Sequence, residues 1–389
     1  MGKQVLGRLR NLIKSFGSGT LRLIGPSRSS FLQKDAEFDR ILLVRQHNQL
    51  GDMLCVVPML RALRSRYPHA HIALLASPVN YDIMVNNQYL NETILFNKSE
   101  FVSQGLIRLF RLIGFVRALR RRDFDLAIVP ATVSISATSN LLAYLSGAQT
   151  RIGPRSIDGQ HNSTGFLFNN LVAPDWRETP ERHQTVRNLE YLAPLGINSE
   201  KDLTSAITLN QQEKADGKLF VSNVLDRRTS CVVFHPGAGK IPNRWPAQHF
   251  ALVANILSME FDAMVLITSG AFDGDPVQDM VSTLSVPYHI LSNKTIRMVA
   301  SILCEADLLV TNDTGIMHVG GAVGTPVLSL FGPTEPYQWA PIGAVHRFVQ
   351  SKGKDIDSIA VDEVLKHARE MLRFSRMIKS GDRPSLAER

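Results

Sequence analysis

The sequence has little cysteine and no long apolar segment. Its three cysteines, Cys55, Cys231 and Cys304, are far apart and form no CxxC pair. This pattern argues against a disulfide framework and against a cysteine zinc site, and it is typical of a reducing compartment. No run of 18 apolar residues is present that could span a membrane. The N-terminus lacks the continuous apolar stretch and small-residue cleavage site of a secretory signal.

Motifs of several large enzyme classes are also missing. The segment HPGAGKIPN resembles a phosphate loop, but Phe234 stands where GxxxxGK[ST] needs Gly, and Ile241 where it needs Ser or Thr. GxGxxG fails at the same place, because Gly237 and Gly239 are followed by Pro242. No HExxH, GxSxG or EF-hand pattern occurs. These absences disfavour a P-loop kinase, a classical dehydrogenase, a zincin and a serine hydrolase.

Acidic residues are missing from the first 34 positions, which contain seven Lys or Arg, whereas the whole chain has a formal net charge of +8. A second basic cluster lies at 104–122, where apolar residues are interspersed with arginines at helical spacing. A basic amphipathic helix of this kind can bind an anionic membrane surface. The alternative is a solvated helix face packed on a sheet, and the sequence favours neither. Nucleic-acid binding is disfavoured, because the basic residues have aliphatic neighbours and no reader motif occurs.

The rest of the chain has the composition of a globular protein, with 44% hydrophobic and 20% charged residues. Its 389 residues predict two domains. After residue 40, short apolar runs alternate with segments of helical periodicity, which is typical of α/β proteins with a parallel, doubly wound sheet. We expect a long loop at 154–180 and a linker within 198–229. The predicted organisation is a basic extension at 1–40, one Rossmann-like domain at 41–205, a second at 225–350, and a C-terminal helix and tail at 351–389.

Individual strands and helices can be assigned from the same pattern. In the first domain we expect strands at 41–45, 71–76, 93–96, 125–130 and 150–152, and helices at 52–67, 104–122, 136–146 and 183–195. In the second we expect strands at 231–237, 263–268, 288–291, 307–311 and 326–331, and helices at 246–259, 295–304, from 314, and at 359–374. Ligands of such folds bind outside the carboxyl ends of the strands, so the cleft between the domains is the expected site.

Three segments at strand ends carry candidate site residues. The first, QLGDMLCVVPMLRAL at 49–63, follows the first predicted strand. Gly51 there would let another molecule approach the backbone closely, and Asp52 would present a carboxylate to the cleft. The alternative is that Asp52 only caps the helix, which is the commonest role of Asp at such a place.

The second segment, at 307–336, joins a strand to a helix and ends in the loop GPTEP. Asp313 and Thr314 are residue types that cap helices, and Gly315 would open this one. Free backbone N–H groups at the positive end of a helix suit a diphosphate. His318 can add a donor. An ordinary capped helix with a core histidine is the alternative for an isolated DTG, but the combined pattern is more specific.

The third segment, at 235–250, combines a glycine turn at Gly237 with Lys240 and Arg244 ahead of a helix. This arrangement predicts another anion site. We expect Trp245 to pack and seat the helix rather than to stack on a ligand.

Two carboxylates follow the predicted strand that ends at Thr268. Asp273 or Asp275 could accept hydrogen bonds from ribose hydroxyls, as acidic residues do in nucleotide-binding folds. A polar turn without a ligand explains the same residues equally well, and the sequence alone leaves both interpretations open.

Together, the segments LGDMLCVVPMLRAL, HPGAGKIPNRWPAQHF and DTGIMH to FGPTEP resemble the signature blocks of glycosyltransferase family 9, the ADP-heptose:lipopolysaccharide heptosyltransferases. The resemblance extends, with gaps, from about residue 41 to 372. It implies a GT-B fold of two facing Rossmann-like domains, with the acceptor on the N-terminal one and the donor on the C-terminal one. It also implies inverting transfer without a metal ion or other cofactor.

The resemblance assigns roles to particular residues. Asp52 stands at the position of the family's catalytic base. Asp313, Thr314, Gly315 and His318 stand at its donor-binding motif. The chain departs from the family ahead of Trp245, where relatives commonly have a phosphate-binding Lys at the position of Asn243. Arg244 or Lys240 could take over that contact.

The resemblance further implies an ADP-heptose donor and a lipid-anchored oligosaccharide acceptor, met by a cytoplasmic enzyme at the inner face of the inner membrane. The chemistry agrees with this independently. An inverting transfer needs one carboxylate to deprotonate the acceptor hydroxyl, and positive partners for the departing diphosphate on the opposite side of the sugar. Other nucleotide sugars or acceptors, a non-catalytic nucleotide-sugar-binding protein and a GT-B epimerase remain alternatives.

Overall fold

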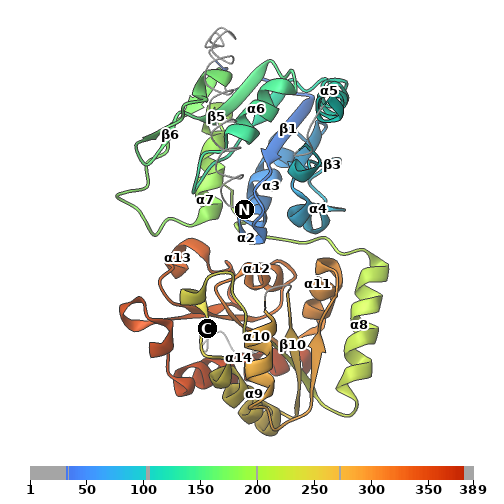
Figure 1. Cartoon of the computed structure of the whole chain (residues 1–389), viewed down its shortest axis with the longest axis vertical. Helices are drawn as coiled ribbons and strands as arrows, with labels where there is room; N and C mark the ends of the chain where they lie inside the picture. The colour runs from blue at the N-terminus through green and yellow to red at the C-terminus, as the bar shows by residue number, and fades with distance from the viewer. Residues whose placement is uncertain (1–31, 34, 102–105, 199, 271–272, 381–389) are drawn as a thin grey trace.

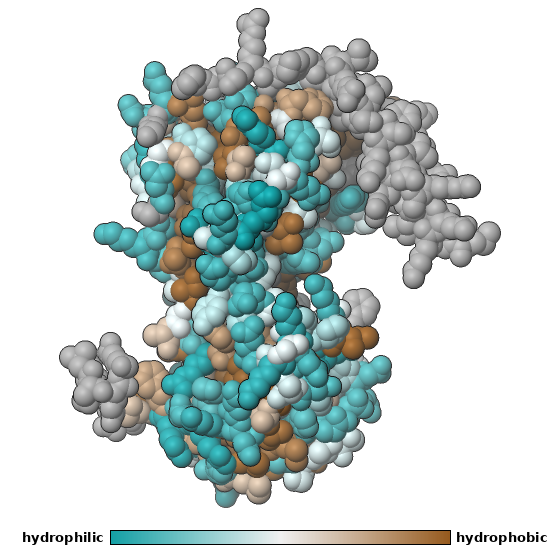
Figure 2. Space-filling view, turned by 90° about the vertical axis from the view of Figure 1, so that its left-hand side faces the viewer, coloured by the Kyte–Doolittle hydropathy of each residue, from teal (hydrophilic) through white to brown (hydrophobic). Residues whose placement is uncertain are grey.

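The computed structural model describes residues 32–33, 35–101, 106–198, 200–270 and 273–380. Nearly all of the basic segment at 1–34 therefore lies outside the described residues. Two α/β units are stacked along the long axis of the molecule, with a narrower waist between them (Figures 1 and 2). Each unit contains a six-stranded sheet.

The sheet of the first unit is parallel throughout and has the order β3-β2-β1-β4-β5-β8. Its central strands are apolar and buried on both faces, as expected when helices cover both sides of a parallel sheet. The strands are β1 (Arg40–Arg45), β2 (His71–Ala76), β3 (Glu92–Leu95), β4 (Leu126–Ile128), β5 (Thr150–Pro154) and β8 (Asn170–Val172). The helices are α2 (Leu50–Leu54), α3 (Val57–Arg66), α4 (Pro78–Met84), α5 (Leu106–Arg120), α6 (Ala137–Leu145) and α7 (Gln184–Leu189).

Two predictions for the first unit are wrong in detail. The single helix expected at 52–67 is two helices, α2 and α3. Pro58 lies in the first turn of α3 and has no N–H to bond to the preceding turn, so a continuous helix is not possible there. The loop expected at 154–180 contains a short hairpin, β6 (Ser156–Ile157) and β7 (Gln160–His161), and the edge strand β8.

The sheet of the second unit has the order β11-β10-β9-β12-β13-β14 and is again parallel throughout. Its strands are β9 (Ser230–His235), β10 (Ala263–Thr268), β11 (Tyr288–Leu291), β12 (Leu308–Asn312), β13 (Val327–Phe331) and β14 (Arg347–Gln350). Its helices are α8 (Gln211–Leu225), α9 (Ala247–Phe261), α10 (Gly274–Val281), α11 (Ile296–Glu305), α12 (Gly315–Ala322), α13 (Pro336–Trp339) and α14 (Val361–Ser380).

The second unit is larger than the sequence pattern indicated. Helix α8 packs against α11, so structure belonging to this unit begins ahead of residue 225. The edge strand β14 follows β13, which we expected to be the last strand, and α10 was not expected at all. The prediction of an α/β fold with two doubly wound parallel sheets is confirmed.

The order of strands fixes where ligands can bind. In both sheets the chain starts at a central strand, β1 or β9, moves outward on one side and then returns to the other side through β4 or β12. In such sheets the crevice at this switch point, outside the carboxyl ends of the strands, binds the ligand. Helices α2 and α12, which follow the central strands β1 and β12, pack against each other at the waist between the units (Figure 1).

Helices α2 and α12 approach each other closely because both have glycines at the contact. A Cβ atom on Gly51 would lie 2.5 Å from ring atoms of His318, and one on Gly315 would lie 3.1 Å from Leu50 Cδ1. A side chain at Gly51 would therefore clash with the His318 ring, and one at Gly315 would require Leu50 to shift by a few tenths of an ångström.

A second contact between the units lies at the linker. Arg297 of α11 donates hydrogen bonds to the carbonyls of Asp82 and Val85 at the end of α4, over 2.8 and 3.2 Å. The same guanidinium bonds to the Thr208 carbonyl of the linker and forms an ion pair with Glu213 of α8. One arginine thus ties both units and the linker together.

Candidate active site

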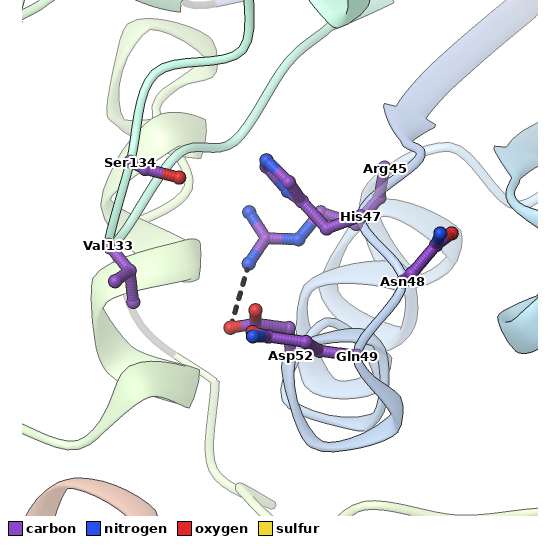
Figure 3. A pocket seen from close by; sticks show the side chains of 7 residues that line it. All are labelled: Arg45, His47, Asn48, Gln49, Asp52, Val133 and Ser134. Atoms are coloured by element: carbon purple, nitrogen blue, oxygen red, sulfur yellow. Dashed lines mark hydrogen bonds and ion pairs between the residues drawn. The ribbon is translucent and has the colours of Figure 1, made fainter. Parts of the chain in front are cut away.

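Asp52 lies in the first turn of α2, directly after β1, and only 5% of its surface is exposed. The N-cap of this helix is Gln49, so the interpretation of Asp52 as the capping residue is wrong. An acidic side chain in the first turn is favoured by the helix dipole. Asp52 Oδ1 forms an ion pair with Arg45 Nη2 at 3.2 Å (Figure 3).

The carboxylate of Asp52 borders a cavity of about 260 Å³ at the carboxyl end of the first sheet. Arg45, His47 and Asp52 project from the β1–α2 side toward the loop after β4 (Figure 3). Burial, and next the charge of Arg45, lower the pKa of His47 below its usual 6.5, so its imidazole is neutral at pH 7. The cavity is lined by Arg45, His47, Asn48, Gln49, Asp52, Val133 and Ser134.

The second unit presents the turn that follows β9. Gly237 is needed there, because a Cβ atom would lie 2.1 Å from Asp273 Oδ1. The other oxygen of Asp273 accepts a hydrogen bond from the Gly270 N–H over 2.7 Å. The structure therefore brings Asp273 to this turn, whereas Asp275 is exposed in the first turn of α10.

The two cations of this segment differ in their surroundings. Lys240 is exposed. Arg244 is half-buried, and its Nε donates to the Ala238 carbonyl over 2.8 Å, which fixes the guanidinium beside the turn. Trp245 is buried and donates from its ring nitrogen to the Ile359 carbonyl over 3.0 Å, so its predicted packing role is confirmed.

Asp313, directly after β12, is half-buried and hydrogen-bonded to neutral side chains. Asn243 donates from Nδ2 to Asp313 Oδ2 over 2.9 Å and also lies 3.2 Å from Thr334 Oγ1. Burial raises the pKa of Asp313, opposed by its hydrogen bond with Thr334 and by the charge of Lys240. The departure at Asn243 therefore places an amide, rather than a cation, against this carboxylate.

Thr314 is the N-cap of α12, and Gly315 is the first helical residue, as predicted from the sequence. His318 follows in the same helix but is buried against Gly51 rather than open to the cleft. Its ring centroid is 6.2 Å from that of Trp339. Burial lowers the pKa of His318 to about 3, so its ring is neutral at physiological pH.

Sequence reasoning missed Asn312, which joins the loops of this unit. Asn312 Nδ2 donates to the carbonyls of Pro236 and Gly237, over 2.9 and 3.2 Å, and its Oδ1 accepts from the Trp245 N–H over 3.0 Å. The buried asparagine at the end of an apolar strand was the available signal. Within the described residues, no group of three or more His, Cys, Asp or Glu side chains could hold a metal ion.

Known proteins are similar to this chain in both fold and sequence. The family model for glycosyltransferase family 9 (heptosyltransferase) matches residues 112–364. Lipooligosaccharide heptosyltransferase 2 of Haemophilus influenzae is 32% identical over 313 residues, which cover 77% of this chain and 86% of that relative. Lipopolysaccharide heptosyltransferase 3 of Escherichia coli is 28% identical over 300 residues, which cover 75% and 83%.

A solved structure, that of E. coli ADP-heptose lps heptosyltransferase II, has a TM-score of 0.70 and 21% identity, and the likeness covers 87% of this chain and 99% of that one. The fold is of the GT-B type, and the family model together with the sequence relatives shows that the protein is a glycosyltransferase. The chain belongs to glycosyltransferase family 9, the heptosyltransferases.

Proposed function

We propose that this glycosyltransferase transfers a heptose from ADP-heptose to a lipopolysaccharide core acceptor, with inversion at the anomeric carbon. The observation that carries the proposal is the placement of Asp52. This buried carboxylate borders a cavity in one unit, and its helix α2 packs on α12, which opens at the donor-binding motif of the other unit.

On the acceptor side, Asp52 acts as the general base. Arg45 binds its Oδ1, and among the described residues this is the single ion pair that Asp52 makes, so Oδ2 is available for the acceptor. The acceptor hydroxyl gives its proton to Asp52 as its oxygen attacks the anomeric carbon, and the bond from that carbon to the diphosphate breaks. The space beside Gly51 is filled by the ring of His318, so this glycine allows the close approach of α12 rather than that of the sugar expected from the sequence.

On the donor side, the charge that develops on the diphosphate is met by Lys240, Arg244 and the N-terminal end of α12, with the turn at Gly237 giving close access to the backbone. These groups supply positive charge without a metal ion. Asp313 and Thr314 would bind the donor at the start of the helix. Asp273, rather than the predicted Asp275, is the better candidate for a contact with the nucleotide, because it lies against the turn at Gly237.

The choice of donor and acceptor rests on relatives. The compared E. coli structure is named an ADP-heptose lps heptosyltransferase, and the two sequence relatives are named for lipopolysaccharide and lipooligosaccharide. Another nucleotide sugar is the alternative, since Asn243 replaces the cation usual before Trp245.

A donor screen tests this choice. Calorimetry with ADP-heptose, UDP-sugars and GDP-sugars should give binding for the ADP-sugar, and incubation with a heptose-deficient core acceptor should add one heptose by mass spectrometry. Tighter binding of a UDP- or GDP-sugar, or transfer of a hexose, would contradict the assignment. Epimerised donor without transfer would indicate an epimerase.

We also propose peripheral contact with an anionic membrane at the cytoplasmic face of the inner membrane. Within the described residues, no helix is long and apolar enough to cross a bilayer. Helix α5 buries Leu119 and packs Phe115 against Phe96, with the ring centroids 5.2 Å apart. Its outer face exposes Phe110, Arg111, Arg117, Arg120 and Arg121. This arrangement supports docking to anionic lipid, and no nucleic-acid partner is proposed.

Vesicle co-sedimentation tests the membrane contact. Changing Arg111, Arg117 and Arg121 together to Gln should weaken binding to vesicles containing phosphatidylglycerol, most clearly at low salt, while leaving transfer to a soluble acceptor intact. If the triple variant binds such vesicles as well as the wild type does, α5 is not the docking surface.

A further inference from the structure

Arg45 is a buried arginine that takes no direct part in the proposed transfer of the proton or the sugar. It is the last residue of β1, and only 2% of its surface is exposed. Its Nη2 lies 3.2 Å from Asp52 Oδ1 (Figure 3), and its Nη1 donates to the Pro130 carbonyl over 2.8 Å. One guanidinium therefore connects the carboxylate after β1 with the backbone after β4.

The carboxylate depends on this contact for its orientation. Among the described side chains, Arg45 is the cation within ion-pair distance of Asp52. A buried charge without a partner is strongly disfavoured. Among the described residues, Arg45 is also the side chain that is hydrogen-bonded to the Asp52 carboxylate.

The bond from Arg45 to Pro130 connects the guanidinium with the loop that forms the opposite wall of the cavity. The backbone after β4 is fixed by two side chains, since Tyr191 donates to the Ala131 carbonyl over 2.7 Å beside the bond from Arg45 to Pro130. This loop continues to Val133 and Ser134, which line the cavity opposite Asp52 (Figure 3). The guanidinium of Arg45 therefore sets the distance between the Asp52 carboxylate and the loop after β4.

We propose that Arg45 is a positioning residue, which holds Asp52 Oδ1 so that Oδ2 faces the acceptor hydroxyl at a set distance from the loop after β4. This inference rests on the proposed role of Asp52 as the base. Arginine suits the task because its planar fork can bond two acceptors in fixed directions, whereas the single ammonium of lysine cannot reproduce both.

A double-mutant cycle tests the inference. Arg45→Met should lower kcat about 100-fold, as expected when a reacting group is misplaced by about 1 Å, while the Kd for ADP stays within about twofold of wild type. Arg45→Lys should recover part of that loss. In the Asp52→Asn background, Arg45→Met should change kcat less than about threefold, because the carboxylate that Arg45 positions is already gone.

The controls separate this role from a structural one. Arg64 bonds to the carbonyls of Pro68 and Ala70, away from the cavity. Arg64→Met should change kcat by the same factor in both backgrounds. Equal losses from Arg45→Met in both backgrounds, or wild-type kcat in Arg45→Met, would overturn the inference. If Arg45→Met does not fold, Arg45→Lys completes the cycle and must show the same non-additivity. Full activity of Asp52→Asn alone would instead overturn the proposed function.

Discussion

The two aspartates at the cleft, Asp52 and Asp313, both follow the end of a strand but are held in opposite ways. Asp52 is paired with the cation Arg45, whereas Asp313 is bonded to the neutral amide of Asn243. Burial accordingly raises the pKa of Asp313, which favours its protonated form. Asp52 is held on one oxygen, which leaves the other for an acceptor hydroxyl, whereas Asp313 lies among neutral donors and suits hydrogen bonding to a sugar.

The difference arises although both sheets have the same strand order. The fold brings strand ends to one cleft, but the few residues after each strand decide the electrostatics there. The first unit places a carboxylate beside an arginine, and the second combines glycine turns, helix N-termini and partly exposed cations. The two sides can therefore be perturbed independently.

The largest effect is expected on the acceptor side. Asp52→Asn should lower kcat by about 10²–10⁴-fold, because a general base is lost, while ADP-sugar binding is retained. Steady-state kinetics and calorimetry on the same preparation measure both quantities. Wild-type turnover in this variant would refute the assignment of Asp52 as the base. Loss of ADP-sugar binding would contradict the claim that the acceptor and donor sides can be perturbed independently.

On the donor side, Arg244→Ala should weaken ADP binding by about 1.5–3 kcal/mol, with a loss that depends on salt, because a charge-assisted contact to phosphate is removed. Titration calorimetry at two salt concentrations checks this. Lys240→Ala is the matched variant. Unchanged affinity in Arg244→Ala together with weak binding in Lys240→Ala would move the phosphate contact to Lys240.

His318, which packs on Gly51 where the two units meet, should make the stability of the protein depend on pH. Its pKa is about 3 in the folded protein and about 6.5 when unfolded, so below pH 6.5 the unfolded state binds the proton first. His318 should therefore cost about 2 kcal/mol of stability between pH 7.5 and 5. Urea unfolding at both pH values should show a smaller loss in His318→Gln, and an identical loss would contradict the buried, neutral state.

The fit between α2 and α12 can be tested with a single methyl group. Gly51→Ala should destabilise the protein by about 1–3 kcal/mol, because the added Cβ lies 2.5 Å from the His318 ring. Gly114→Ala is the matched control, since its Cβ meets nothing within 4 Å and alanine favours a helix. Thermal unfolding compares the two. A Gly51→Ala protein as stable as the control would show that the units do not pack as described.

No effect is expected from chelation. EDTA should leave kcat within about twofold, because the phosphate contacts proposed for the second unit come from side chains and a helix end. A clear loss that Mg²⁺ or Mn²⁺ restores would show that the donor side needs a metal ion.

The central strands could be predicted from sequence because they are continuous apolar runs, and β2 and β10 match their expected ranges to the residue. The edge strand β11 also matches its expected range, because three of its four residues, YHIL, are apolar or aromatic although most of the strand is exposed. The edge strands β8 and β14 could not, since NLV and RFVQ each contain only two apolar residues, which is too few to mark a strand. Of the site, Gly51, Asp52 and the DTG motif were recognisable as segments at strand ends. The pair Asn243–Asp313 was not, because these residues are 70 apart in sequence and meet only since β9 and β12 are neighbours in the sheet. The pair Arg45–Asp52 was not, because the path of the short loop between β1 and α2 decides whether residues seven apart meet.

The stereochemistry of the product tests the central claim most directly. Attack by an acceptor hydroxyl activated by Asp52, with the diphosphate leaving on the opposite side, inverts the anomeric carbon in a single step. NMR of the bond formed by the wild-type enzyme from ADP-heptose should therefore show the configuration opposite to that of the donor. Retention of the donor configuration would contradict the account, because it requires a second displacement that a single base at Asp52 does not provide.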